Sequence, residues 1–170
     1  MLLCLLCLIQ NVVIASEIQA NNNNGKLQFS GEHAGMVFTG EFLEWHASII
    51  LPPEKHALIT ASFNVASAKT GDATYDETLP EEDWFYVEKY PKSTFVSDTI
   101  VQNGAGYQVR GTLELRGKRQ KIAFVLEDKG DVLEANFIVD RLAFDIGRES
   151  DVSAEWVSKD IKMSLLIDKP

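Results

Sequence analysis

The stretch YQVRGTLEL, residues 107–115, decides the fold class. Its odd-numbered positions are apolar or glycine, and its even-numbered positions, from Gln108 to Glu114, are polar or charged. Successive side chains of a β-strand point to opposite faces, so this alternation predicts a strand with one dry face and one solvated face. An antiparallel sheet buried on one side is therefore expected.

The same alternation recurs through most of the chain. It is found in residues 27–33, 45–51, 57–63, 122–126, 133–139 and 161–167. Turn sequences that suit hairpins lie between some of these segments, at Asn103-Gly104, at Gly117 and at Lys129-Gly130-Asp131. The pattern predicts an all-β protein of about eight antiparallel strands, either a sandwich or a barrel. Glycines inside the strands favour the bends that a barrel needs.

One short helix is expected between the strands. Asp72 is a candidate N-cap for a helix that ends near Leu79. Pro91 then favours an extended chain that enters a strand at Lys92. The intervening stretch DWFYVEKYPKSTF, residues 83–95, is rich in aromatic residues. We interpret Trp84 and Phe85 as a packed plug that seals one region of the barrel, with direct ligand contact as the alternative.

The first residues differ in composition from the rest. Residues 1–20 begin with an uncharged apolar run that predicts a secretory signal peptide, and a misplaced start codon is the alternative. Val13 and Ala15, or Ile18 and Ala20, supply the small residues of a cleavage site. The asparagine run that follows makes residues 21–26 an expected flexible spacer. Residues 27–170 then form a single domain.

Charge and motif content exclude several function classes. The 170-residue chain carries 25 acidic and 16 basic residues, a formal net charge of −9, which disfavours nucleic-acid binding. Neither a G-x-S-x-G elbow nor an H-E-x-x-H motif occurs, and both cysteines lie in the expected signal peptide. The three histidines lack metal-ligand spacing, and the acidic run 81–83 is typical of a solvated face. A non-enzymatic protein without a metal site is predicted.

Three sequence blocks, in order and spacing, resemble the YceI-like family. They are TGDATYDETLPEEDWFYVEKYPKSTF at 70–95, GTLELRGKRQKIAFVL at 111–126 and VDRLAFDIG at 139–147. Phe29 and His33 are similar to the family's opening F-x-x-x-H, and the resemblance covers about residues 27–168. Asp145 departs from it, because glycine is expected there.

This resemblance implies an architecture and a ligand. The expected fold is an extended, eight-stranded, antiparallel lipocalin-like β-barrel with one or two short helices and a long apolar tunnel. The expected role is a periplasmic binding or carrier protein for an isoprenoid-tailed lipid of the quinone or polyprenyl phosphate type. No other cofactor is expected.

The alternation and the resemblance together nominate ligand-binding residues. His33 and Arg141 are candidates for binding a headgroup, although a structural histidine, and an ion pair of Arg141 with Asp140 or Asp145, are alternatives. The apolar tunnel candidates are Phe29, Phe38, Phe42, Trp45, Ile49, Phe63, Trp84, Phe85, Phe95, Leu113, Phe124, Phe137 and Phe144.

Two other roles stay open beside the carrier. Some members of the resembled family occur beside diheme cytochromes b, which implies an accessory protein of a membrane cytochrome and quinone system. A lipid-modifying enzyme that uses His33 as acid or base is the less favoured alternative. A homodimer is also left open.

Overall fold

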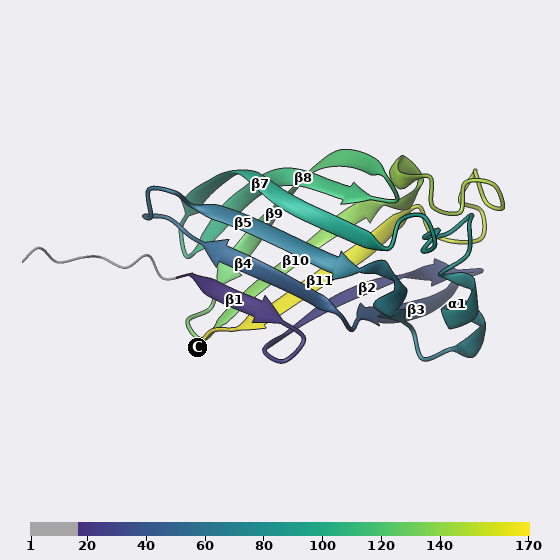
Figure 1. Ribbon diagram of the computed structural model, residues 1–170, viewed down its shortest axis with the longest axis horizontal. Coiled ribbons are helices and arrows are strands. Elements are labelled where there is room, and N and C mark those ends of the chain that lie inside the picture. The colour runs from purple at the N-terminus through teal and green to yellow at the C-terminus, as the bar shows by residue number, and fades with distance from the viewer. Residues whose placement is uncertain (1–16) are drawn as a thin grey trace, which may run out of the picture.

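All the strands described belong to one antiparallel sheet that curls around an apolar interior (Figure 1). The computed structural model describes residues 17–170. The strand order is β1-β4-β5-β7-β8-β9-β10-β11-β2-β3-β6, so β1 and β6 form the two margins. The strands are β1 (Ile18–Asn21), β2 (Gly25–His33), β3 (Met36–Phe42), β4 (Trp45–Ile50), β5 (Leu58–Asn64), β6 (Ala68–Lys69), β7 (Lys92–Asn103), β8 (Gly106–Leu115), β9 (Lys118–Asp128), β10 (Val132–Asp140) and β11 (Asp160–Asp168).

The all-β, antiparallel, lipocalin-like prediction is confirmed, but the strand count was too low. The sheet has eleven strands within the described residues, where about eight were expected. Two of the unexpected strands, β1 and β6, have four and two residues. A segment that short cannot display a period-two pattern, and only its pairing with a neighbour identifies it as a strand.

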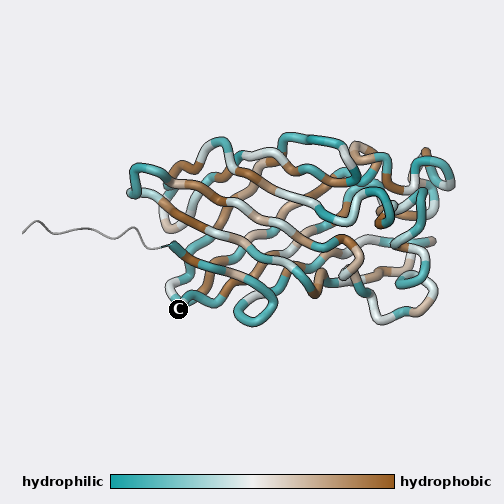
Figure 2. The backbone as a smooth tube through the Cα atoms, viewed as in Figure 1, coloured by the Kyte–Doolittle hydropathy of each residue, from teal (hydrophilic) through white to brown (hydrophobic). Residues whose placement is uncertain are grey.

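The alternation in β8 produces the expected two faces. Val109, Leu113 and Leu115 are buried, whereas Arg110 and Glu114 are exposed. Figure 2 shows hydrophobic residues recurring along the strands that enclose the interior. The buried residues form one continuous core, so the sheet wraps around a single apolar layer.

The predicted helix and turns are present. Helix α1 spans Ala73–Thr78, and the Asp72 carboxylate caps it by accepting hydrogen bonds from two backbone N–H groups. β7 begins at Lys92, as Pro91 predicted. Two 3-10 helices, η1 (Val65–Ser67) and η2 (Arg141–Phe144), complete the described elements.

Asp145 explains how the chain does without the expected glycine. It ends η2 in the left-handed region, with φ of 57°, a conformation that aspartate tolerates better than most residues. Its carboxylate pairs with Lys118 at 2.8 Å and Arg148 at 2.7 Å. These two ion pairs hold the Asp145 carboxylate in place. The aspartate therefore keeps the turn for which glycine was expected.

Residues 21–26 are not the flexible spacer that their composition predicted. They comprise the last residue of β1, a turn, and the first residues of β2. The Asn24 side-chain amide donates to the carbonyl oxygens of Gln19 in β1 (3.0 Å) and Asp168 in β11 (3.2 Å). The amide therefore fastens the β1 margin to β11. The signal peptide stays a prediction, because residues 1–16 lie outside the described part of the chain.

In the β2–β3 pair, the ring of Phe29 occupies the space that a side chain of Gly40 would need. Gly40 lies opposite Phe29, and a Cβ atom added to Gly40 would lie 2.2 Å from Cζ of the Phe29 ring. Phe29 is only 6% exposed, so its ring has little room to move aside. The missing side chain of Gly40 thus gives the ring its place against the sheet.

We expect Gly40→Ala to lower the free energy of unfolding by about 1–3 kcal/mol through overpacking. Denaturant titration measures the loss. Adding Phe29→Leu should recover part of it, because the shorter side chain vacates the space that Cβ needs. Strictly additive losses in the double variant would contradict this account.

Within residues 17–170, no helix is long and apolar enough to cross a bilayer.

Candidate ligand-binding cavity

The curled sheet encloses an apolar cavity of about 160 Å³. Every predicted tunnel residue lines it except Phe144. For the candidates that lie on strands, the period-two pattern identified the inward face, because it specifies which face of a strand a side chain occupies. Lining residues that were not nominated include Leu27, Ala47, Ile59, Ala61, Ile122 and Met163. Each of these small or aliphatic residues lies at an inward-facing position in the alternation of its strand.

Phe144 belongs to the core and not to the cavity wall. It lies in η2, is 1% exposed and packs within the apolar core. The sequence analysis places Phe144 among the inward-facing tunnel residues. β10 instead ends at Asp140, whose carboxylate caps η2, and the helical turn rotates Phe144 out of the strand pattern.

Aromatic rings fill much of the interior on two sides of the cavity. The Phe42 ring centroid lies 5.3 Å from that of Phe29, 4.8 Å from Phe63 and 6.1 Å from Phe85. A second group forms around Phe124, whose ring lies 5.6 Å from Phe95 and stacks at 5.0 Å on Phe137. These separations are those of favourable aromatic pairs. The cavity is the space that the rings leave.

The aromatic segment 83–95 closes part of this interior. Trp84 and Phe85 both line the cavity, and Phe85 is 8% exposed. The backbone N–H of Phe85 donates to the carbonyl of Leu79 at 3.0 Å, which folds the segment back on the end of α1. The segment therefore packs as a plug and faces the cavity at the same time, so the two interpretations of the sequence do not exclude each other.

Asp83 fastens this plug to the loop that follows η2. Its carboxylate accepts hydrogen bonds from the backbone N–H groups of Glu149 (2.8 Å) and Ser150 (2.9 Å) and from the Ser150 hydroxyl (2.5 Å). The N–H of Gly147 donates to the Asp83 carbonyl at 2.6 Å. Four hydrogen bonds thus hold the residue beside Trp84.

Stability should depend on the ionisation of Asp83. Burial raises the pKa of this carboxyl, but the Ser150 hydroxyl, the N–H groups of Glu149 and Ser150, and Arg116 together hold its pKa below the ordinary value of 3.8. Because the folded state then binds fewer protons than the unfolded state, the stabilisation is present above that value and is lost as pH falls through the lower, folded-state pKa.

We therefore expect the stability difference between the wild type and Asp83→Asn to shrink as pH falls from 6 towards about 3. Urea titrations at stepped pH measure it. The asparagine variant is the matched control, because it has a similar shape and no proton to gain. A difference that stays constant over this range would contradict the role assigned to the Asp83 charge.

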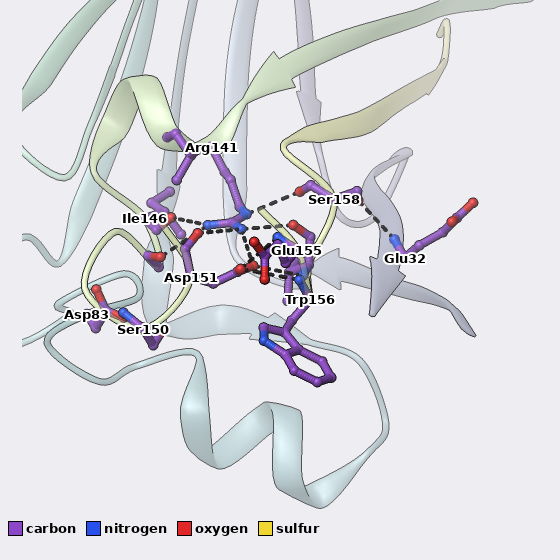
Figure 3. A network of polar contacts seen from close by, with 12 residues as sticks. Glu32, Asp83, Arg141, Ile146, Ser150, Asp151, Glu155, Trp156 and Ser158 are labelled. Atoms are coloured by element: carbon purple, nitrogen blue, oxygen red, sulfur yellow. Dashed lines mark hydrogen bonds and ion pairs between the residues drawn. The ribbon is translucent and has the colours of Figure 1, made fainter. Parts of the chain in front are cut away.

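Arg141 lies at the centre of a buried polar network next to the plug (Figure 3). Its Nη2 pairs with the Asp151 carboxylate at 2.6 Å and also donates to the carbonyl of Val157 at 2.8 Å. Nη1 donates to the carbonyls of Ile146 (2.7 Å) and Gly147 (3.4 Å), and Nε donates to that of Ser158 (3.1 Å). Arginine has five N–H groups, and these contacts occupy them.

The ion-pair partner of Arg141 was predicted wrongly. Neither Asp140 nor Asp145 pairs with it, because Asp140 caps η2 and Asp145 binds Lys118 and Arg148. The partner is Asp151, ten positions further on. With every guanidinium N–H engaged by protein oxygens, we assign Arg141 a structural role. Its charged end lies 5.9 Å from the Trp84 ring, so the network also supports the plug.

His33 does not line the cavity. Its Nδ1 lies 2.9 Å from the Tyr75 hydroxyl of α1, and the two rings are 5.6 Å apart. The contact joins the end of β2 to the helix that covers it. A headgroup role for His33 stays a prediction. No group of three acidic, histidine or cysteine side chains within residues 17–170 gathers in a way that would hold a metal ion.

Sequence reasoning missed the two aspartates that organise this end of the molecule. Asp83 was assigned to a solvated acidic run, and Asp151 was not singled out. A weak signal was present, because Asp83 directly precedes the aromatic pair and a carboxylate there needs partners once those rings are buried. The residues that supply the partners lie more than sixty positions away.

A curled antiparallel sheet around an apolar cavity defines a class of lipocalin-like binding folds. The family model described as a YceI-like domain matches residues 18–168. The chain therefore belongs to the YceI-like family.

Curated relatives share part of this chain. A UPF0312 protein of Photorhabdus laumondii is 28% identical over 120 residues, which cover 64% of this chain and 62% of that protein. A UPF0312 protein of Yersinia pestis is 28% identical over 116 residues, covering 66% and 59%. The chain thus spans less than two thirds of the length of both relatives.

Solved structures have the same fold at lower identity. BcnA of Burkholderia cenocepacia superposes with a TM-score of 0.77 at 23% identity, covering 84% of this chain and 94% of that one. A polyisoprenoid binding domain from Saccharophagus degradans, implicated in plant cell wall breakdown, gives 0.65 at 13% identity, covering 92% and 100%. A Campylobacter jejuni YCEI protein gives 0.63 at 21% identity, covering 77% and 84%.

Proposed function

We propose that this protein binds the apolar part of a lipid in the cavity inside its sheet. The observation that carries the proposal is the chemistry of the lining, which consists of aliphatic and aromatic side chains together with Arg141, whose donors are engaged. Among the described residues no acid, histidine, serine or cysteine lines the cavity. Binding therefore suits this lining better than catalysis does.

The size of the cavity sets how a ligand fits. An apolar cavity of about 150 Å³ accommodates a molecule the size of benzene, and this cavity has about 160 Å³. A single ring or a short branched segment fits without rearrangement. A chain of several isoprene units requires some of the aromatic side chains to swing aside, so we expect long ligands to bind by induced fit.

Hydrophobic burial supplies enough free energy for such binding. Hiding about 400 Å² of apolar ligand surface contributes roughly 10 kcal/mol at about 25 cal/mol per Å². Association and ordering, together with movement of the rings, offset several kcal/mol of this. Micromolar affinity is compatible with the remainder, without specific polar contacts.

The more specific form of the proposal is a periplasmic carrier for an isoprenoid-tailed lipid. The apolar N-terminal sequence supports export, and the solved neighbour described as a polyisoprenoid binding domain supports the ligand class. A quinone or a polyprenyl phosphate fits the proposal equally well. A cytochrome b partner rests on the family resemblance alone, and a homodimer is left open.

Lipid extraction tests the proposal. The protein is purified without detergent and extracted with organic solvent, and the extract is analysed by mass spectrometry. Ala61→Phe should abolish recovery of bound lipid, because Ala61 lines the cavity and a phenylalanine there fills it. Ala123→Phe is the matched control, because the same substitution is made at an exposed position of β9 in the same sheet.

We expect a stoichiometric apolar lipid from the wild type and from Ala123→Phe, and little from Ala61→Phe. Equal recovery from all three proteins would mean that the lipid binds elsewhere and would overturn the proposal. No lipid from any of them, together with no uptake of added isoprenoid quinone, would overturn it as well.

A further inference from the structure

The most exposed apolar side chains of the protein gather at one end of the sheet. Five large apolar side chains within residues 17–170 are at least 60% exposed, and four of them lie in two short segments: Met36 (66%), Val37 (72%), Val152 (63%) and Trp156 (62%). Met36 and Val37 begin β3, and the other two belong to the loop between η2 and β11. Figure 1 shows the β2–β3 hairpin and this loop at the end opposite the C-terminus. These four residues form the apolar tip.

Backbone contacts join the two segments of the apolar tip. The N–H of Ala34, in the turn before Met36, donates to the carbonyl of Trp156 at 2.8 Å. Val157 forms an isolated bridge with His33, which lies opposite Met36 in the β2–β3 pair. Single exposed apolar residues are ordinary on a protein surface, but several held together mark an interaction site.

The loop that carries Trp156 is held in place by the network around Arg141 (Figure 3). The Asp151 carboxylate accepts hydrogen bonds from the N–H groups of Glu155 (2.9 Å) and Trp156 (3.2 Å), and the Asp151 carbonyl accepts one from Ala154 (3.1 Å). The backbone of Trp156 is therefore bonded at both its N–H and its C=O. A side chain presented by such a fixed backbone loses little freedom on binding, so more of its burial appears as affinity.

The apolar tip adjoins the cavity. Phe38 follows Val37 in the chain, Val157 follows Trp156, and both of these next residues line the cavity. Each segment thus presents one apolar side chain to solvent and the next to the interior. A lipid surface in contact with the apolar tip would lie next to the cavity wall.

The size of the apolar tip favours a bilayer over a protein partner. A large aromatic side chain has about 150–250 Å² of surface, so the four side chains together expose on the order of 400 Å². A stable protein–protein interface needs about 800 Å² from each partner. Insertion into a bilayer has no such threshold, because each apolar side chain adds affinity through its own burial.

The charges beside the apolar tip select the kind of bilayer. The two basic side chains of the loop, Arg148 and Lys159, are both paired with aspartates, at 2.7 and 3.3 Å. Glu32, Glu149 and Glu155 are exposed on the hairpin and the loop. An anionic bilayer would repel these carboxylates, whereas a zwitterionic one would not.

We propose that the apolar tip inserts into the interface of a zwitterionic bilayer and docks the protein there. The Trp156 indole suits the headgroup level, where tryptophan is enriched in membrane proteins. Met36, Val37 and Val152 supply the aliphatic contacts with the acyl boundary. This inference goes beyond the proposed function, because it concerns the outer surface of the protein and requires no ligand in the cavity.

Flotation with phosphatidylcholine vesicles tests the docking. The full chain should float with the vesicles, and Val37→Asp should lower its partition coefficient about tenfold, because a carboxylate replaces an inserted apolar side chain. Val101→Asp is the matched control and should float like the wild type. Val101 is 60% exposed and lies near the β7–β8 turn, at the other end of the sheet. All three proteins share one N-terminal sequence, so its apolar run contributes equally to each.

Tryptophan fluorescence reports on the contact itself. Trp156 is 62% exposed, whereas Trp45 is 6% exposed and Trp84 is partly buried. Phosphatidylcholine brominated in its acyl chains should therefore quench the wild type more than Trp156→Phe. Adding phosphatidylglycerol to the vesicles should weaken flotation at low salt.

The outcomes separate docking from cavity binding. Equal flotation of Val37→Asp and the wild type, without quenching of Trp156, would overturn the docking proposal. So would a wild type that ignores vesicles but self-associates in sedimentation through a contact that Val37→Asp abolishes. Tighter binding to phosphatidylglycerol vesicles would refute the choice of a zwitterionic bilayer. Docking without any lipid in the solvent extract would leave this inference standing and refute the proposed function, and extracted lipid without docking would do the reverse.

Discussion

Asp151→Ala is expected to lower the free energy of unfolding by about 3–5 kcal/mol, because it breaks a buried ion pair and leaves one charge without a partner. The side chains of Asp151 and Arg141 are 5% and 3% exposed, and their charged atoms lie 2.6 Å apart. The Asp151 carboxylate also accepts hydrogen bonds from the N–H groups of Glu155, Trp156 and Val157. The substitution therefore removes one charge and strands four donors.

The pKa of Asp151 reflects the same environment. Burial raises the pKa, but hydrogen bonds from the three backbone N–H groups and the charge of Arg141 lower it by more. The pKa of the Asp151 carboxyl therefore lies below its ordinary value. Its folded-state pKa is depressed, so the contribution of the pair persists at neutral pH and is lost in acid.

Asp98→Ala provides the matched control for Asp151→Ala. Asp98 pairs with Lys121 at 2.8 Å, but both side chains are well exposed. An exposed pair contributes less than about 1 kcal/mol, because water and salt screen it. Chemical denaturation of the two variants compares the same substitution in buried and exposed pairs. If Asp151→Ala cost no more than Asp98→Ala, the network around Arg141 would not be structurally important.

Phe42→Ala is expected to cost about 3–5 kcal/mol and to enlarge the cavity. Phe42 is 3% exposed and contacts rings from β2, β5 and the plug, so its removal separates three parts of the interior. The surrounding sheet collapses only partly into such a space, which is why the cost exceeds that of hydrophobic transfer alone.

Denaturant titration measures this loss, and an unchanged slope against denaturant would show that the fold is retained. Val37→Ala is the control, because Val37 is 72% exposed and its truncation should change stability by no more than about 0.5 kcal/mol. We also expect the Phe42→Ala protein to admit bulkier apolar probes than the wild type. A stability loss as small as that of Val37→Ala would contradict the assignment of Phe42 to the centre of the core.

The cavity wall could be predicted from sequence because alternate residues of a strand point to the same face of the sheet. Phe29, Phe63 and Phe124 required only the alternation in their own segments. The Asp72 cap and the strand that begins at Lys92 were also predictable, since both depend on residues within a few positions. Local chemistry thus determined most of the architecture.

The features that could not be predicted depend instead on contacts that local sequence patterns do not encode. Arg141 pairs with a carboxylate from the far side of a loop, and Asn24 contacts β11, the last strand along the chain, so neither contact has a periodic signature. Phe144 was nominated for the tunnel, but it lies in a short 3-10 helix that follows the strand, where the alternation of a strand no longer determines which way a side chain faces. The apolar tip was equally unpredictable, because its two segments come together only in the folded chain.

Strand β1 restricts where an exported form of this protein could be processed. Cleavage after Ala15 would leave β1 whole, whereas cleavage after Ala20 would remove most of it, including a side chain that is 1% exposed. β4 would then lose its outer neighbour and present unsatisfied backbone groups along a free border. Such a border invites pairing with other chains, so a leader peptidase that cut at the later site would release an adhesive, self-associating product.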